Sequence, residues 1–82
     1  MKKAIVTGGS RGIGYNIAKK LVQNGCKVVI TGRNIKTLKY AANCLGENVS
    51  PMVWDIAEFD KAWEKINEAA GMLGGLDIVV NN

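Results

Sequence analysis

Four short apolar segments recur along the chain at a regular interval. They occupy Lys3–Thr7, Lys27–Thr31, Pro51–Trp54 and Leu76–Val80, and their starts lie 24 or 25 residues apart. Their centres favour β-branched residues that follow one another without alternating polar positions, which is typical of strands buried on both faces of a parallel sheet. The spacing leaves room for one helix between consecutive strands, which is the connection that parallel strands require.

The three intervening stretches carry apolar residues at helical spacing, and each stretch ends at a glycine, a common helix stop signal. The stripes comprise Ile13, Ile17, Leu21 and Val22 before Gly25; Ile35, Leu38, Ala41, Ala42 and Leu45 before Gly46; and Phe59, Ala62, Trp63, Ile66, Ala69, Ala70 and Leu73 before Gly74. We expect these stripes, together with Trp54, to pack in the core. Pro51 is expected to open the third strand, where its missing N–H costs little.

The order of elements is therefore β-α-β-α-β-α-β, an α/β fold that corresponds to half of a Rossmann doubly wound parallel sheet. Right-handed crossovers predict the strand order 3-2-1-4. We find no linker or second domain, so residues 1–82 form one unit. In such a sheet ligands bind outside the carboxyl ends of the strands, at the switch between strands 1 and 4.

Composition narrows the functional classes. The 82 residues are 48% hydrophobic and 22% charged, as in a packed domain. Their apolar runs are too short for a membrane span or a signal peptide. The absence of histidine removes histidine-based triads and metal ligands, and two cysteines cannot build a zinc site, so no metal is expected. We expect Cys26 and Cys44 to be small apolar packing residues in a reducing, cytoplasmic setting.

Charge is divided unevenly along the sequence. The first 41 residues contain nine lysines and arginines and no acid, whereas all seven acids follow. This division indicates an anionic partner, although solvated helix faces would also explain it. Nucleic acid is the less favoured partner, because the basic residues are scattered and only 6% of residues are aromatic and able to stack on bases. A phosphorylated cofactor is the favoured one.

The end of the first strand reads Thr7-Gly8-Gly9-Ser10-Arg11-Gly12-Ile13-Gly14. Glycines at positions 8, 12 and 14 allow a tight turn, a close approach to a pyrophosphate and close packing of helix on sheet. Unpaired N–H groups at the following helix start would point at the phosphates. The alternative is a purely structural turn between strand and helix.

The end of the second strand, Thr31-Gly32-Arg33-Asn34, lacks the carboxylate that an NAD site usually places there for the ribose 2′-OH. Arg33, with Arg11 from the glycine loop, would instead pair with a 2′-phosphate, which favours NADP over NAD. The alternative for Arg33 is simple solvation. Asn34 is expected to cap the second helix without touching ligand.

The third strand is followed by Asp55 and Ile56. An acid at this place can accept a hydrogen bond from the adenine amino group while the isoleucine covers a face of the ring. The alternative for Asp55 is a turn or capping role.

These motifs, taken in order, resemble the N-terminal part of the short-chain dehydrogenase/reductase family over all 82 residues, and most closely its NADPH-dependent 3-oxoacyl-thioester reductases. The family pattern TGxxxGxG matches Thr7, Gly8, Gly12 and Gly14, its acid after strand 3 matches Asp55, and its NNAG motif matches Asn81 and Asn82. The resemblance implies that Asn82 lies near the ribose by its backbone and that Asn81 ties neighbouring strands together. It also implies a cofactor site made of Gly8, Ser10, Arg11, Gly12, Ile13, Gly14, Arg33, Asp55, Ile56 and Asn82.

The resemblance implies hydride transfer between a nicotinamide and a carbonyl or alcohol substrate by the whole protein. The family's catalytic Ser and Tyr-x-x-x-Lys lie beyond its NNAG motif, so no catalytic residue is expected within residues 1–82. The pattern also occurs as Tyr15 to Lys19, but in the first helix and without its serine, and we interpret it as a coincidence. A non-catalytic dinucleotide-binding or interaction module remains the alternative. An apolar fourth strand left at the edge predicts self-association, or else a chain that is part of a longer protein.

Overall fold

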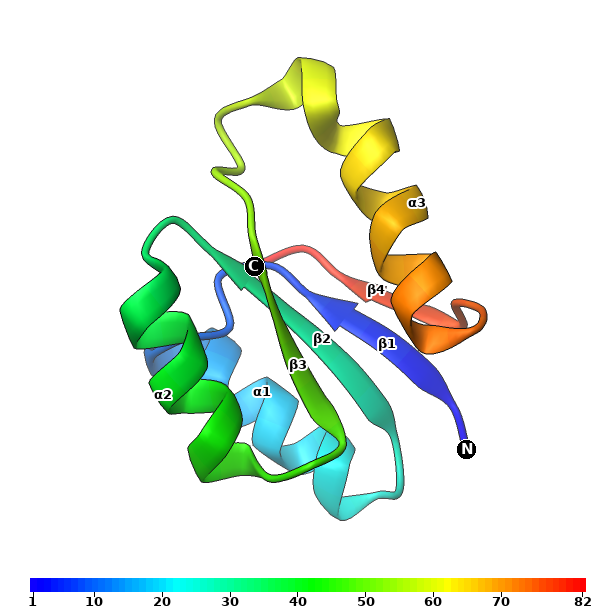
Figure 1. Ribbon diagram of the computed structural model, residues 1–82. Helices are drawn as coiled ribbons and strands as arrows, with labels where there is room; N and C mark the ends of the chain where they lie inside the picture. Colours follow the sequence, from blue (N-terminus) through cyan, green and yellow to red (C-terminus); the bar gives the residue numbers. More distant parts are fainter.

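The computed structural model describes all 82 residues and contains four strands, three α-helices and one short 3-10 helix. In chain order the elements are β1 (Lys3–Val6), α1 (Gly12–Gln23), β2 (Lys27–Gly32), α2 (Ile35–Leu45), β3 (Val49–Val53), η1 (Phe59–Lys61), α3 (Ala62–Leu73) and β4 (Ile78–Val80) (Figure 1). The alternation of strand and helix is the one that the hydrophobic pattern predicts. No helix combines the length and the apolar character that a bilayer crossing needs.

The four strands form one parallel sheet in the order β3-β2-β1-β4. In the register, Val6 lies beside Ile30 of β2 on one side and Val80 of β4 on the other. The predicted α/β class and the order 3-2-1-4 are therefore confirmed. β1 lies between β2 and β4, so the carboxyl end of β1 is flanked by the carboxyl ends of both neighbouring strands. The chain continues to one side of β1 with β2 and β3 and then crosses to its other side with β4.

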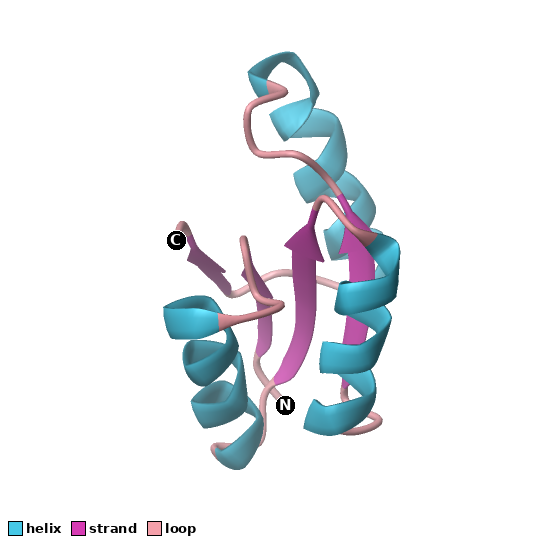
Figure 2. Ribbon diagram, turned by 90° about the vertical axis from the view of Figure 1, so that its left-hand side faces the viewer, coloured by secondary structure: helices cyan, strands magenta, loops and turns pink.

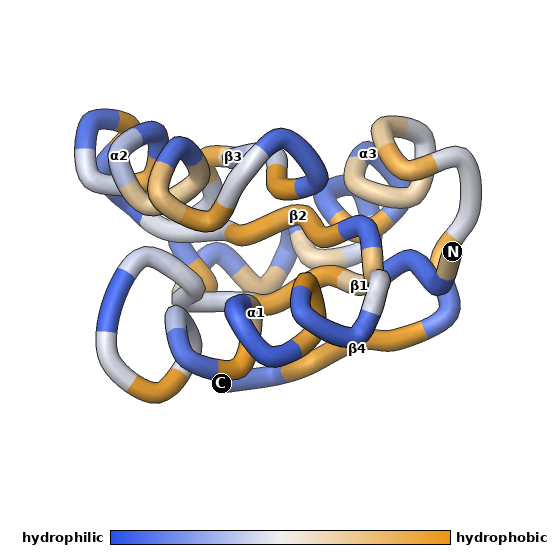
Figure 3. The backbone as a smooth tube through the Cα atoms, turned by 90° about the horizontal axis from the view of Figure 1, so that it is seen from below, coloured by the Kyte–Doolittle hydropathy of each residue, from blue (hydrophilic) through white to orange (hydrophobic).

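Helices cover both faces of the sheet. Viewed from the side in Figure 2, α1 and α2 lie in front of the strands and α3 lies behind them. The tube in Figure 3 shows β1 and β2 as hydrophobic stretches between these helical layers. Successive strand residues face opposite helices, and this is why the strands read as continuous apolar runs without alternation.

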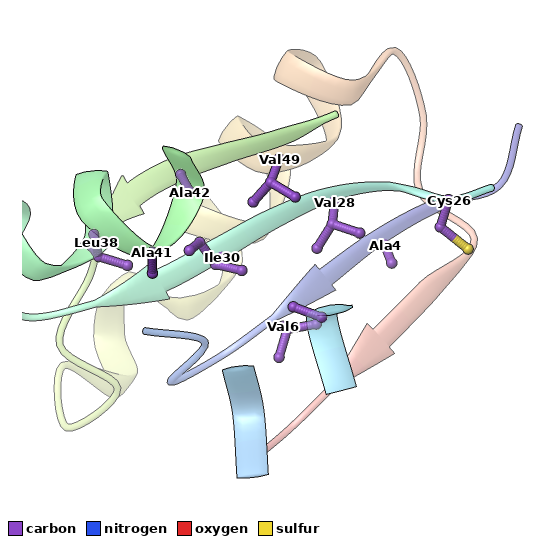
Figure 4. Packing of buried hydrophobic residues seen from close by; sticks show 10 residues of the cluster. Ala4, Val6, Cys26, Val28, Ile30, Leu38, Ala41, Ala42 and Val49 are labelled. Atoms are coloured by element: carbon purple, nitrogen blue, oxygen red, sulfur yellow. The ribbon is translucent and has the colours of Figure 1, made fainter. Parts of the chain in front are cut away.

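The larger core cluster lies between the sheet and the first two helices. It brings together Ala4 and Val6 of β1, Val28 and Ile30 of β2 and Ala18 of α1, with Leu38, Ala41 and Ala42 of α2, Val49 of β3 and Cys26 (Figure 4). The residues between them, Ile5 and Val29, face the other way and pack with Met52, Ala69 and Leu73 under α3. The sheet is therefore packed on both faces, by α1 and α2 on one side and by α3 on the other.

Several local expectations are wrong. Pro51 does not open β3 but is its third residue, which is tolerated because β3 is an edge strand whose outer side needs no partner. Cys44 is exposed on α2, whereas Cys26 is buried as expected.

Four large residues of the predicted helical stripes are also exposed instead of packed: Ile13 by 73%, Ile35 by 42%, Phe59 by 81% and Trp63 by 78%. The reason is visible at the start of α3, whose first turns lie beyond the strand ends, where there is no sheet to pack against (Figure 1). Ile13 lies in the first turn of α1.

Candidate functional site

A pocket of about 890 Å³ lies at the carboxyl ends of β1, β2 and β3. Six of the residues predicted to bind a cofactor line it: Gly8, Ser10, Arg11, Arg33, Asp55 and Ile56. They come from three loops that are far apart in the sequence, and the sheet brings them to one place. The same wall includes residues for which no ligand role was predicted, namely Thr31, Gly32, Asn34, Ile35, Thr37 and Trp54.

The glycine turn after β1 is anchored to β2. Gly9 donates a backbone hydrogen bond to the carbonyl of Thr31 at 3.1 Å, and a Cβ at Gly9 would lie 2.6 Å from Ile30. Gly8 has a φ of +67°, a left-handed conformation that side chains disfavour. The turn therefore needs glycine for its own path and for its contact with the neighbouring strand.

The start of α1 is open to an anion. Its N-cap residue, Arg11, makes no side-chain capping bond, and the first turn contains no acid. The first N–H groups of a helix have no partner within it, so these donors and the positive end of the helix dipole face outward. A Cβ at Gly12 would meet nothing within 4 Å, which shows that the space beside this turn is free.

Close packing of α1 on the turn depends on Gly14. A Cβ there would lie 2.2 Å from the carbonyl oxygen of Gly8 and 2.7 Å from Nδ2 of Asn82. Gly14 is buried and does not line the pocket, so its place in the site is to bring the helix start against the turn.

The turn is also tied to β4, through the Thr7 hydroxyl. Thr7 Oγ1 donates to the carbonyl of Val80 at 3.3 Å and accepts from the backbone N–H of Asn82 at 3.0 Å. Asn82 Nδ2 donates to the Gly8 carbonyl at 3.4 Å. The expected tie between strand ends is thus made by Asn82 and not by Asn81, whose side chain makes no hydrogen bond and lines an apolar hollow beside α3. Sequence reasoning gave Thr7 no such role, and its position at a strand end was the available signal.

The loop after β2 carries an exposed Arg33 and no carboxylate. Asn34 caps α2 as predicted, because its Oδ1 accepts from the N–H groups of Lys36 at 2.9 Å and Thr37 at 3.4 Å. The two salt bridges of the molecule both belong to the second half of the chain, Lys61 with Glu58 and Lys65 with Glu68. The arginines of the pocket therefore have no carboxylate partner.

The loop after β3 is held by Asp55. One carboxylate oxygen accepts from the N–H of Ala57 at 3.0 Å, so the turn role that the sequence left open is realised. The same residue lines the pocket, with its other oxygen making no bond. Trp54 is buried beside it, and its backbone N–H donates to the Gly32 carbonyl at 2.9 Å.

The remaining predicted residues lie apart from the main pocket. Gly12 lines a smaller hollow between α1 and α2, Ile13 points into solvent, and Asn82 lies under the glycine turn. Tyr15 packs partly buried against the larger core cluster and Lys19 is exposed, so this pair forms no part of the strand-end pocket.

Comparison with known proteins gives a family match and similar structures. The family model described as short chain dehydrogenase matches residues 2–82. The 3-oxoacyl-(acyl-carrier-protein) reductase FabG of Chlamydia muridarum is 41% identical over 85 residues, which cover 99% of this chain and 34% of that protein.

Two solved structures have the same fold. The TT0495 protein from Thermus thermophilus has a TM-score of 0.89 at 40% identity, covering 100% of this chain and 33% of its own. The 3-ketoacyl-(acyl-carrier-protein) reductase from Brucella melitensis complexed with NADH has a TM-score of 0.86 at 28% identity, covering 95% and 32%. The chain spans about a third of the length of these relatives. Because the family match covers nearly every residue and the fold agrees, this chain belongs to the short-chain dehydrogenase family.

Proposed function

We propose that residues 1–82 are the NADP(H)-binding part of an oxidoreductase that moves a hydride between a nicotinamide and a carbonyl or alcohol substrate. The observation that carries this proposal is the strand-end pocket, which holds two unpaired arginines and has an uncapped helix start on its rim. Its chemistry fits a ligand with several phosphate groups.

In this proposal the pyrophosphate lies at the start of α1. Gly8, Ser10 and Gly12 form the turn beside it, and the free N–H groups there donate to its oxygens. Gly14 and Asn82 support the turn from below. Ile13 would take part only through its backbone, because its side chain points into solvent.

The adenosine end would lie between the loops that follow β2 and β3. Arg11 and Arg33 pair with the 2′-phosphate, since both line the pocket and neither has a carboxylate to neutralise it. Asp55 keeps one oxygen for the adenine amino group, and Ile56 covers the ring. Asn82 contributes its backbone near the ribose.

The proposed preference for NADP rests on this chain's own residues. One solved relative is described as complexed with NADH, so similarity to it does not favour the phosphorylated coenzyme. NADP is favoured instead by the missing carboxylate after β2 and by Arg33, the cation that stands there.

When bound, the nicotinamide supplies or accepts the hydride. The groups that would polarise the substrate carbonyl and hold its proton, by family resemblance a Ser and a Tyr-x-x-x-Lys, do not fall within residues 1–82. We therefore expect these residues to bind the coenzyme without catalysing the reaction.

Calorimetry tests the proposal. We expect NADP⁺ to bind more tightly than NAD⁺, and Arg33→Asp to weaken NADP⁺ binding by roughly tenfold to a hundredfold while NAD⁺ binding is kept, because hydrogen bonds to charged groups are worth about 1.5–3 kcal/mol. Lys39→Asp is the matched control, because it makes the same change of charge on the exposed part of α2 outside this pocket. Absence of heat with both nucleotides would overturn the proposal, and an equal loss in both variants would reject the role of Arg33.

A further inference from the structure

A second cavity adjoins the strand-end pocket. It is the hollow of about 330 Å³ between α1 and α2, on the face of the sheet opposite α3 (Figure 2). Its volume falls within the range of about 300–1,000 Å³ that is usual for small-molecule sites. Ser10 and Arg11 line both cavities, so the two meet at the glycine turn. The proposed function assigns no ligand to this hollow.

Two aromatic side chains line the hollow, one from each helix. Tyr15 belongs to the first turn of α1 and packs half-buried against the larger core cluster, which fixes its position. Tyr40 belongs to α2 and is 74% exposed. Aromatic rings attract one another in offset or edge-to-face contacts. These two side chains therefore favour a ligand with a flat aromatic ring over an aliphatic one of similar size.

The charges around the hollow select the sign of the ligand. Arg11 is exposed at its edge, and the salt bridges of the molecule involve neither this arginine nor any residue of α1 or α2. The two helices contain four lysines and no acid, since the first acid of the chain is Glu47. A guanidinium pairs strongly with a carboxylate or a phosphate, and the surrounding lysines add to the attraction. The hollow consequently suits an anion and disfavours a cation.

From these features we infer that the hollow between α1 and α2 is a binding site for a flat aromatic anion. The ring lies beside Tyr15 and Tyr40, and the negative group pairs with Arg11. Because Arg11 also lines the strand-end pocket, this ligand engages a cation that a coenzyme phosphate needs. Its occupation of the hollow therefore weakens coenzyme binding. That effect rests on the proposed function, whereas the site itself does not.

Cys44 provides a local reporter for the test, because it lines the hollow and is exposed, whereas Cys26 is buried. The rate at which iodoacetamide alkylates Cys44 is measured by mass spectrometry with naphthoate, naphthamide or the saturated decalin carboxylate present. The amide lacks the charge, and the saturated acid lacks the aromatic ring. Binding of naphthoate is also measured by calorimetry.

Three variants accompany the ligands. Arg11→Gln removes the cation and Tyr40→Leu removes an aromatic ring, both at exposed positions, so the Tm should be retained. Phe59→Leu is the matched control, because it removes an aromatic ring of similar exposure that does not line this hollow. NADP⁺ binding is measured for the unchanged chain with and without naphthoate.

At about ten times its Kd, naphthoate should slow alkylation of Cys44 by about tenfold, because the thiol then reacts mainly in the unoccupied fraction. Naphthamide and decalin carboxylate should bind at least about threefold more weakly, and Arg11→Gln and Tyr40→Leu should weaken naphthoate binding by a similar factor or more. Phe59→Leu should leave it unchanged. Saturating naphthoate should raise the Kd for NADP⁺ by at least about threefold.

The outcomes separate this inference from the proposed function. Equal protection of Cys44 by all three ligands, or by none, would overturn the site, and so would naphthoate binding that survives in both Arg11→Gln and Tyr40→Leu. Protection of Cys44 with an unchanged Kd for NADP⁺ would overturn the shared use of Arg11. Failure of NADP⁺ to bind the unchanged chain would reject the proposed function, while the protection of Cys44 would still decide whether the site exists.

Discussion

Replacing Gly14 with alanine tests whether the helix start must touch the glycine turn. The new Cβ would lie 2.2 Å from the Gly8 carbonyl oxygen, whereas a real Cβ essentially never comes closer than 3.0 Å, so α1 would have to retreat by about 0.8 Å. The atom that blocks it belongs to the backbone of a turn anchored to β2 and cannot swing aside. The same retreat would disturb the hydrogen bond from Asn82 Nδ2 to the Gly8 carbonyl.

The expected change in the free energy of unfolding for Gly14→Ala is the sum of two opposing effects. Overpacking of this kind costs about 1–3 kcal/mol, and alanine in place of glycine within a helix returns about 0.5–1 kcal/mol. We expect a net loss of about 1–2 kcal/mol, which lowers the Tm by about 5–15 °C for a domain of this size. Coenzyme binding should fall with it, because the free N–H groups of α1 would move away from the turn.

Gly71→Ala is the matched control. Gly71 lies in α3, and a Cβ there would meet nothing within 4 Å, so the same substitution should stabilise the protein by about 0.5–1 kcal/mol. Unfolding in urea can be followed by tryptophan fluorescence, since Trp54 is buried and its emission should change on exposure. A Gly14→Ala protein as stable as the unchanged chain, or one that binds nucleotide equally well, would refute the reasoning.

Three further outcomes are expected. Thr7→Val removes the acceptor of the Asn82 N–H and should cost about 1–2 kcal/mol in urea unfolding, whereas Thr7→Ser, which keeps the hydroxyl, should cost clearly less. Asp77→Ala removes the carboxylate that accepts from the backbone N–H of Lys3 at 2.9 Å and should cost about 0.5–1 kcal/mol, as judged by the same assay; an unchanged midpoint would show that this bond does not help fix the edge strand. The hydrogen bond from Lys61 to Glu58, with the attraction of that carboxylate, raises the pKa of Lys61 above its usual 10.5. A raised lysine pKa adds stability at lower pH that is lost as the pH rises through it, so the small stability difference between the unchanged chain and Glu58→Gln should be present at pH 7 and vanish above that pKa. Persistence of the difference in strong alkali would contradict this assignment.

Strand order and helix limits could be predicted because they depend on local pattern and on general rules of chain crossing. The helix predicted over the stripe from Ile35 to Leu45 has those bounds in the structure. Side-chain burial was less predictable. Helical spacing identifies a face of a helix but not how far a neighbouring layer extends, and for that reason Phe59 and Trp63 were expected inside although they lie beyond the sheet.

In the candidate site, too, some residues could be predicted from the sequence and others could not. Arg11 and Arg33 follow directly from their positions after strands, and the pocket brings them together. The part played by Thr7 depends on a residue 75 positions away and could not be inferred from its neighbours. Asn34 was predicted as a cap from its place before the second helix, and its Oδ1 accepts from the N–H groups of Lys36 and Thr37 as a cap does.

The double anchoring of the glycine turn, to Thr31 on one side and through Thr7 to β4 on the other, has a consequence for folding order. The turn cannot take its final shape while the chain is partly assembled, because one of its supports, β4, lies at the other end of the sequence and reaches the turn only once it has docked beside β1. A ligand held by this turn will therefore recognise the assembled sheet and not its precursors. Its binding energy adds to the stability of the whole domain by mass action, so that unfolding becomes harder as ligand concentration rises.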